Sequence, residues 1–269
     1  MLLRTNMPEG TVKGWMSMED IAKNETEQGK SAERAAVAEP VELQVRDIQM
    51  FRFMHEQGYL AHSHIKSAFW EACSEEAGAC HHRLDKLVLA GYLAKETGVK
   101  KKLSVYRLRE KGYCELMRRG LQNSMSLFKL NGYHRTNMDH DLKVTNLRIF
   151  FRKHGLAGWT SERVLRKRDN YYLHVPDGLL TVYGEKIAIE LENSTKGRKR
   201  YEALFKNYQG SKEYSRVFMI LNTEIMDWVI DLEYDPEKIW FVEYKTLFRE
   251  GEKTVFKNKA DNFVLAQIL

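Results

Sequence analysis

The chain has 269 residues, of which 43% are hydrophobic and 11% aromatic, so it has room for about two domains with buried cores. Its 43 Lys and Arg residues exceed its 37 Asp and Glu residues, and a net charge of +6 is mild enough that clusters of charge matter more than the sum. No apolar run approaches the ~18 residues of a membrane span, and the Met1–Arg4 start is too short for a signal peptide. We therefore expect a cytoplasmic protein with no membrane partner.

The cysteines exclude a disulfide scaffold. Cys73, Cys80 and Cys114 form neither a paired framework nor a zinc-binding pattern, and they are typical of thiols in a reducing compartment. The two histidines after Cys80 do not make a metal site, because adjacent residues of a helix point in different directions.

Residues 1–43 mix Gly, Glu, Lys and Ser with little periodicity, which predicts a flexible leader with at most a short helix near 32–38. The pattern then changes, because apolar residues recur at helical spacing until Gly58 ends the run. This spacing predicts a helix whose buried face carries Val45, Ile48, Phe51 and Met54.

Beyond Gly58 we expect two more helices, two strands and another helix, in the order 64–70, about 75–89, a strand beginning in 90–93, Ser104–Leu108, and a helix from about Arg109. The apolar stripe of the 75–89 helix is Cys80, Leu84, Leu87 and Val88. The two strands are joined by the basic turn Gly98–Lys102.

This order over residues 44–120, with the string RLDKLVLAGYLAKE…KKLSVYRLREKG, resembles the winged helix-turn-helix fold of DNA-binding proteins. The resemblance implies that the third helix enters the major groove and that the wing contacts phosphates. The residues implied to bind double-stranded DNA are His81, His82, Arg83, Lys86, Lys100, Lys101 and Lys102. The alternatives are an ordinary solvated lysine turn and a winged helix used to dock another protein.

A linker over 121–136 is expected because the chain loses its period and becomes rich in Asn, Gln, Ser and Gly; within it, Ser124–Leu130 is a strand or a packing segment. A second domain over 137–269 begins with a helix capped by Asn137 or Asp139. His140 shares a face of that helix with Val144, Leu147 and Phe151, so it is most simply a partly buried histidine. The stretch 159–168 is expected to be a strand leading into a basic run.

Two apolar strands then meet at a hairpin turn near Gly184 and carry three carboxylates. Glu190 and Glu192 share one strand face. A turn at Gly184–Glu185 sets Asp177 opposite Glu192, whereas a one-residue shift sets it opposite Glu190. Either register gathers the three acids, which repel one another unless they share a cation such as Mg2+ or Mn2+. The bland alternative is that Asp177 caps a turn and the glutamates face water.

The strand with Pro176-Asp177, the hairpin and the Glu190-x-Glu192 strand resemble the core of the PD-(D/E)XK nuclease superfamily. The resemblance implies that Asp177 and Glu190, with the carbonyl of Leu191, hold the catalytic metal. Glu192 stands where most members of that superfamily have lysine. Two later residues are candidates for the missing positive charge, namely Lys196 and Lys206.

The rest of the chain predicts a mixed sheet with helices on its faces. A helix opened by the basic run 196–200 has a packing stripe at Tyr201, Leu204, Phe205 and Tyr208. A strand over 217–221, a helix over 223–231, a strand over 239–244 and a charged tail follow. Around the acids we expect a frame of DNA-binding cations that includes Arg166, Arg168, Arg198 and Lys199.

Four motifs follow in order: His-Asp-Leu from His140 at a helix start, Trp-x-x-Glu ending at Glu162, Pro-Asp-Gly around Asp177, and Glu190-x-Glu192 before a helix with Lys206 and Tyr208. This order, over about residues 45–220, resembles the replication-relaxation family of plasmids and other mobile elements. The expected fold class is α+β: an N-terminal winged helix followed by an α/β PD-(D/E)XK-like domain with a central mixed sheet. The resemblance implies that Glu162 joins Asp177, Glu190 and Glu192 at the site, with His140 nearby; a surface Glu162 is the alternative.

The expected function is site-directed DNA binding with Mg2+- or Mn2+-dependent endonuclease or nicking activity. The alternative is a catalytically inactive nuclease-fold factor that acts in replication, transfer or transcription control. Expected partners are replication or transfer proteins of the same element, and a second copy of the chain if the DNA site is palindromic.

Overall fold

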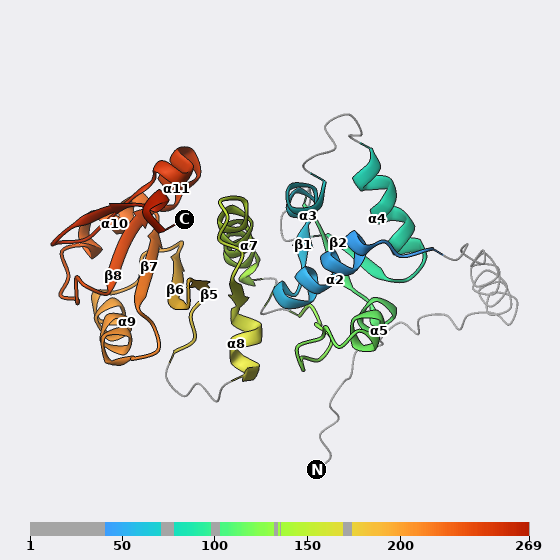
Figure 1. Ribbon diagram of the computed structural model, residues 1–269, viewed down its shortest axis with the longest axis horizontal. Coiled ribbons are helices and arrows are strands. Elements are labelled where there is room, and N and C mark those ends of the chain that lie inside the picture. Colours follow the sequence, from blue (N-terminus) through green and yellow to red (C-terminus); the bar gives the residue numbers. More distant parts are fainter. Residues whose placement is uncertain are drawn as a thin grey trace, which may run out of the picture. The chain divides into compact units, whose positions relative to one another are not determined.

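A computed structural model describes residues 41–70, 78–97, 103–131, 134, 136–168 and 174–268 (Figure 1). Nearly all of the expected leader lies outside the described residues, as do Lys100, Lys101 and Lys102 of the basic turn. Residues Glu42–Leu269 form one compact unit.

The first half of this unit carries a small antiparallel sheet among four helices. Its elements are α2 (Val45–Gln57), β1 (Leu60–Ala61), α3 (His62–Phe69), α4 (Ala79–Leu89), β2 (Leu93–Thr97), β3 (Ser104–Leu108) and α5 (Glu110–Arg118). The strand order is β1-β3-β2, with Leu60 opposite Tyr106 and Leu93 opposite Leu108. The predicted helices and strands of this region are confirmed, each within a few residues.

Helix α2 forms because its apolar residues recur on one face, and it ends where Gly58 adopts φ 92° and donates its N–H to the Met54 carbonyl. Phe51 and Met54 are buried as predicted, but Val45 is wrong as a core residue, because it stands in the first turn of the helix and is 75% exposed. The segment after α5 forms no strand over Ser124–Leu130; Met125 and Phe128 are buried there, so it is a packing segment.

The second half is built on a seven-stranded sheet in the order β10-β9-β8-β7-β6-β5-β4. Its elements are α7 (Met138–Lys153), β4 (Trp159–Ser161), α8 (Glu162–Arg168), β5 (Gly178–Val182), β6 (Glu185–Glu192), α9 (Arg198–Gly210), β7 (Arg216–Leu221), α10 (Thr223–Val229), β8 (Ile239–Glu243), α11 (Tyr244–Glu250), β9 (Val255–Lys257) and β10 (Asn262–Val264), with 3-10 turns at Gly251–Lys253 and Leu265–Ile268. Strands β6, β7 and β8 are parallel and the other pairs are antiparallel. The protein is therefore α+β with a mixed central sheet.

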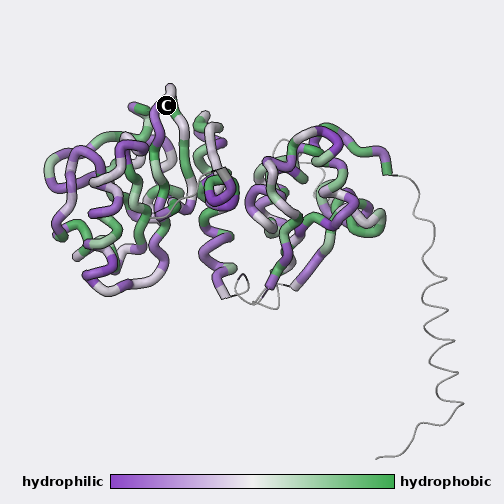
Figure 2. Tube along the Cα trace, turned by 90° about the horizontal axis from the view of Figure 1, so that it is seen from below, coloured by the Kyte–Doolittle hydropathy of each residue, from purple (hydrophilic) through white to green (hydrophobic). Residues whose placement is uncertain are grey.

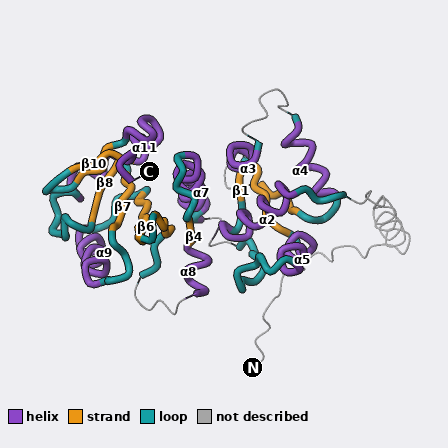
Figure 3. Tube along the Cα trace, viewed as in Figure 1, coloured by secondary structure: helices purple, strands orange, loops and turns teal. Residues whose placement is uncertain are grey.

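Residues of β6 alternate between two cores, as the period of two requires. Ala188 packs with the apolar face of α9 in one core, whereas Ile187, Ile189 and Leu191 pack with α7 in the other. Helices α9 and α7 therefore cover opposite faces of the sheet (Figure 3). Along the chain, hydrophobic stretches alternate with hydrophilic ones, as elements with one buried face require (Figure 2).

The strand expected at the start of 159–168 is β4, which ends at Ser161, and the basic run that follows it forms helix α8 from Glu162. The expected charged tail contains α11 and the β9–β10 hairpin instead; Phe256 is fully buried and stacks on Phe263, with ring centroids 5.2 Å apart. Alternation over three residues is too short to be recognised as a strand.

No helix in the described ranges has the length and apolar composition to cross a membrane.

Gly178 follows Asp177 directly, and its lack of a side chain makes room for the Trp159 indole. A Cβ atom at Gly178 would lie 2.1 Å from Trp159 Cζ2. We expect Gly178→Ala to destabilise the protein by about 1–3 kcal/mol, because the indole is packed and must shift. Chemical denaturation checks this. Gly210→Ala is the control, because nothing lies within 4 Å of the added Cβ, and it should be neutral or slightly stabilising.

His64 is a buried histidine of α3 whose Nδ1 accepts the Ala61 N–H at 3.3 Å. Burial lowers the pKa of His64 to about 4. Because the unfolded chain takes up this proton near pH 6.5, stability is complete above that pH and is lost as the pH falls toward 4. We expect His64→Asn, which keeps an acceptor, to reduce the loss between pH 7 and 5 by about 2 kcal/mol. Chemical denaturation at both pH values measures this loss of unfolding free energy. The control is His82→Asn at an exposed histidine; if His64→Asn alters the loss no more than the control does, the prediction is contradicted.

Candidate functional site

The β5–β6 hairpin determines which carboxylates face each other. Val182 pairs with Glu185 and Gly178 with Ile189, so Asp177, one residue before Gly178, lies level with Glu190. The turn is Tyr183-Gly184, with φ of 49° and 86°. A two-residue hairpin turn of this kind requires positive φ at both positions, so the register is the shifted one and not the one that places Asp177 opposite Glu192.

Asp177 is held between β6 and α7. Its Oδ2 accepts the Leu191 N–H at 2.8 Å, and its Oδ1 lies 3.0 Å from His140 Nε2. Because the N–H and C=O of one strand residue point to the same side, the Leu191 carbonyl also faces the Asp177 side of β6. The expected proximity of His140 to the acids is confirmed.

Glu190 is a buried carboxylate that points toward α9. Its Oε1 lies 2.6 Å from His174 Nε2 and accepts a hydrogen bond from the Tyr208 hydroxyl. Burial, followed by the negative charge of Asp177, raises the pKa of Glu190 to about 7. The two acids therefore interact unfavourably when both are ionised.

Two imidazoles offset this negative charge. Burial would lower the pKa of His140, but the hydrogen bond and charge of Asp177 outweigh burial and raise it to about 9. The pKa of His174 is also raised, because its bond to Glu190 outweighs burial. His140 is therefore an imidazolium at neutral pH, paired with a carboxylate.

Glu192 and Glu162 complete the acidic group. Glu192 Oε1 binds Lys196 Nζ at 2.6 Å, whereas its buried Oε2 has no hydrogen-bond partner among the described residues. Glu162 begins α8 and accepts from Arg166 Nε at 2.8 Å. Burial raises the pKa of both glutamates, and the charge of Asp177 raises each further.

All four acids line one cavity of about 580 Å3, at the end of the sheet where β6 and β7 end. His140, His174, Lys196, Arg166 and Arg200 line it too. The predicted gathering of Asp177, Glu190, Glu192 and Glu162 is thus what the structure has. Lys206 is exposed on α9 and is not among the lining residues, so that candidate for the missing positive charge stands apart from the acids.

In the described part of the chain, no three His, Cys, Asp or Glu side chains are arranged so that they could hold a metal ion. Several of the carboxylate oxygens instead contact a histidine or lysine nitrogen. The unpaired buried Oε2 of Glu192 is the oxygen left without such a contact.

The residues expected to contact DNA fall into three groups. His81, His82 and Lys86 are exposed on α4, with His81 Nε2 3.3 Å from Asp85. Arg83 turns inward instead, because its guanidinium binds the fully buried Asp47 at 3.1 Å and the Glu42 carbonyl at 2.7 Å. Of the other seven, Lys100, Lys101, Lys102 and the Arg168 side chain lie outside what the structure describes. Arg166 pairs with Glu162, Arg198 pairs with Glu202 at 2.7 Å, and Lys199 is exposed.

Sequence reasoning missed His174 and the role of Tyr208. His174 lies three residues before Asp177 in an otherwise apolar stretch, and this was the available signal. Tyr208 was placed on the packing stripe and in the motif order of the family resemblance, and neither predicts that its hydroxyl reaches Glu190.

Compared with protein-family models, with curated proteins and with solved structures, the chain has no match. Its resemblances therefore rest on motifs, and the geometry of the site is the basis for a function.

The His140–Asp177 pair gives a direct electrostatic test of the site. In Asp177→Asn the charge that raises the pKa of His140 is gone, so we expect this pKa to fall from about 9 toward its ordinary value of about 6.5. NMR titration of the imidazole measures it. Asp139→Asn, on the same helix, is the control and should leave the pKa near 9; an equal fall in both variants contradicts the pairing.

Proposed function

We propose that this chain is a DNA-binding protein of a mobile element, similar to the replication-relaxation family, and that the 137–269 region cuts or nicks DNA with Mg2+ or Mn2+. The observation that carries the proposal is the placement of Asp177 and Glu190 level with each other on neighbouring strands, in a cavity that also holds Glu162 and Glu192. Carboxylates are brought together in this way where a hard cation compensates their repulsion.

The topology supports the resemblance to PD-(D/E)XK nucleases. The β5–β6 hairpin bears the acids, α9 follows it, and β7 returns parallel to β6. Glu190 and Glu192 therefore sit at the carboxyl end of a parallel strand, where open α/β sheets bind their ligands, and Asp177 precedes the neighbouring antiparallel strand at the same end of the sheet.

The donor set fits a divalent cation of the Mg2+ type. Asp177, Glu190 and the Leu191 carbonyl would hold it, and the unpaired Glu192 Oε2 offers a further oxygen. When bound, such an ion activates water and stabilises charge on the phosphate oxygens. His140 and His174 hold the carboxylates in place by providing positive charge.

The cations around the cavity suit a phosphodiester. Lys196, bonded to Glu192, stands in for the lysine missing from position 192 and orients water or a phosphate oxygen. Arg166 and Arg200 line the same cavity and attract the DNA backbone. Arg166 is 60% exposed at its side chain, so it can contact a phosphate without leaving the surface.

In this proposal, residues 44–120 bind the DNA. The order helix, strand, helix, helix, strand, strand and the β1-β3-β2 sheet support a winged helix. In this arrangement α4 enters the major groove through exposed His81, His82 and Lys86, and the turn with Lys100, Lys101 and Lys102 contacts phosphates. Arg83 supports α4 from beneath through Asp47.

One observation favours a second candidate, a DNA-binding factor without nuclease activity. The lysine position holds Glu192, and its neighbour Lys196 is already neutralised by it. Such a factor would use the cavity as a binding surface in replication, transfer or transcription control.

Incubation of supercoiled plasmid with Mg2+ or Mn2+ separates the candidates. We expect Asp177→Ala and Glu190→Ala to reduce nicking or linearisation by at least about 100-fold, because each removes a metal ligand. Glu233→Gln, an exposed acid outside the cavity, is the control and should cut like the unmodified chain.

Equal cutting by all the proteins would point to a contaminating nuclease, and no cutting of any DNA would leave the second candidate. Mn2+ binding, followed by electron paramagnetic resonance, gives a readout independent of cutting. The unmodified chain should bind Mn2+ and Asp177→Ala should not.

A further inference from the structure

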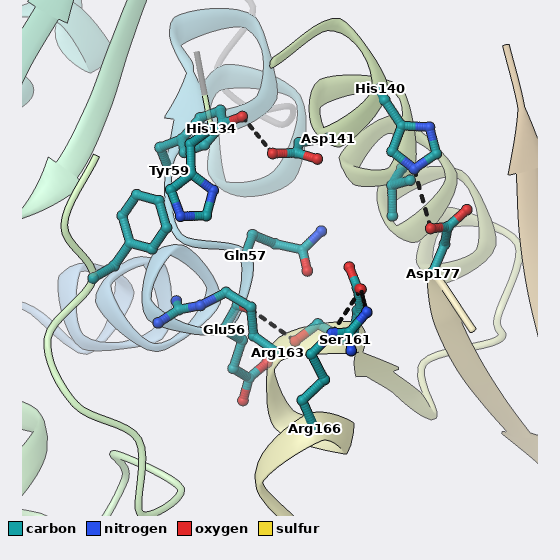
Figure 4. A pocket seen from close by; sticks show the side chains of 13 residues that line it. Glu56, Gln57, Tyr59, His134, His140, Asp141, Ser161, Arg163, Arg166 and Asp177 are labelled. Carbon is teal, nitrogen blue, oxygen red and sulfur yellow. Dashed lines mark hydrogen bonds and ion pairs between the residues drawn. The ribbon is translucent and has the colours of Figure 1, made fainter. Parts of the chain in front are cut away.

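A second cavity, of about 300 Å3, adjoins the acidic one. The two share His140, Asp141, Glu162, Arg166 and Asp177 in their walls. Figure 4 shows Tyr59 and His134 on one side of this second cavity and His140 and Asp177 on the other. Whatever occupies it therefore lies next to the carboxylate proposed to hold the metal.

The wall away from Asp177 is aromatic. The Phe128 ring centroid lies 4.6 Å from that of His134 and 5.7 Å from that of Tyr59, and the Arg163 guanidinium lies 4.8 Å from the Phe128 centroid. Phe128 and Tyr59 are buried against each other. A wall of flat rings favours a flat ligand that stacks on it.

Polar groups are fixed between the two walls. The Gln57 amide donates to Thr145 Oγ1 at 3.2 Å, and Figure 4 shows it pointing into the cavity. Asp141 accepts the Tyr59 hydroxyl at 2.7 Å. These groups offer both donors and acceptors at the edge of a ligand stacked on the aromatic wall.

The charges select the ligand further. Asp141, Glu162 and Asp177 share the walls with three cations, His140, Arg163 and Arg166, so the interior has little net charge and does not favour a free ion. A neutral, planar ring with hydrogen-bonding edges suits such an interior. The partly exposed Arg166, shared by both cavities, can meanwhile hold a phosphate attached to that ring. About 300 Å3 is the lower limit for small-molecule sites and suits a single ring system.

We infer that this cavity binds one unpaired nucleobase of the DNA strand whose phosphodiester lies at Asp177 and Glu190. The inference rests on the proposed function and specifies its substrate: a strand with a base displaced from the duplex or already single-stranded. Stacking on the aromatic wall, in which the half-buried His134 ring is backed by buried Phe128, and hydrogen bonds to Gln57 stabilise the displaced base and offset the cost of unpairing.

The test measures binding without any metal, so it does not depend on cutting. Fluorescence anisotropy and 2-aminopurine emission are recorded, in EDTA, for the full chain with a matched duplex and with the same duplex carrying one unpaired 2-aminopurine. We expect the unpaired base to tighten binding roughly tenfold and to change its emission on stacking. Phe128→Leu and Gln57→Ala should lose this preference while still binding the matched duplex.

Phe248→Leu makes the same substitution at a partly exposed ring of α11 outside the cavity and should keep the preference. Thermal melting establishes that each variant is folded. Equal affinity of the unmodified chain for both duplexes, or a preference that survives both cavity variants, overturns the inference while leaving DNA binding intact. A preference without any plasmid cutting would uphold the inference and refute the nuclease activity. Binding to neither duplex would refute both.

Discussion

The site depends on one carboxylate that is fixed from two directions. The Leu191 N–H ties Asp177 to β6, and His140 ties it to α7, on the other side of the sheet from α9. The charge of Asp177 in turn raises the pKa of the three neighbouring glutamates and of both histidines. Without this anchored charge, Glu190 would be a buried glutamate bound to His174 and Tyr208 with no second carboxylate level with it.

Buried polar contacts connect the elements around this centre to α2. Arg148 of α7 binds Glu56, the Ser161 hydroxyl donates to the Glu56 carbonyl at 2.7 Å, and Arg163 donates to the His55 carbonyl. Groups buried in this way are costly to leave unpaired, so the contacts favour a single arrangement of the elements that supply His140 and Glu162. The proposed DNA-reading and DNA-cutting regions are thereby joined through hydrogen bonds as well as through the chain.

Local patterns were sufficient to predict much of the fold and the identity of the acids. The period of α2, the alternation of β6 and the stripe of α9 each involve neighbouring residues, so Glu190 and Glu192 could be placed on one face of their strand in advance. The register of the hairpin could not be predicted, because it depends on Tyr183 adopting a φ of 49°, which residues other than glycine rarely adopt. Partners distant in sequence were also missed: His140 and Asp177 are 37 residues apart, and Arg83 turns inward because Asp47, buried 36 residues earlier, requires a cation. The strands β9 and β10 are too short for their alternation to be visible.

Neighbouring residues at the start of α7 reach in different directions: His140 toward the sheet and Asp141 toward the Tyr59 hydroxyl. Since both side chains branch from the same helical turn, turning that helix about its axis would stretch the two hydrogen bonds together. Because the aromatic cavity and the acidic one both have His140 and Asp141 in their walls, a rotation of α7 would reshape the two cavities together.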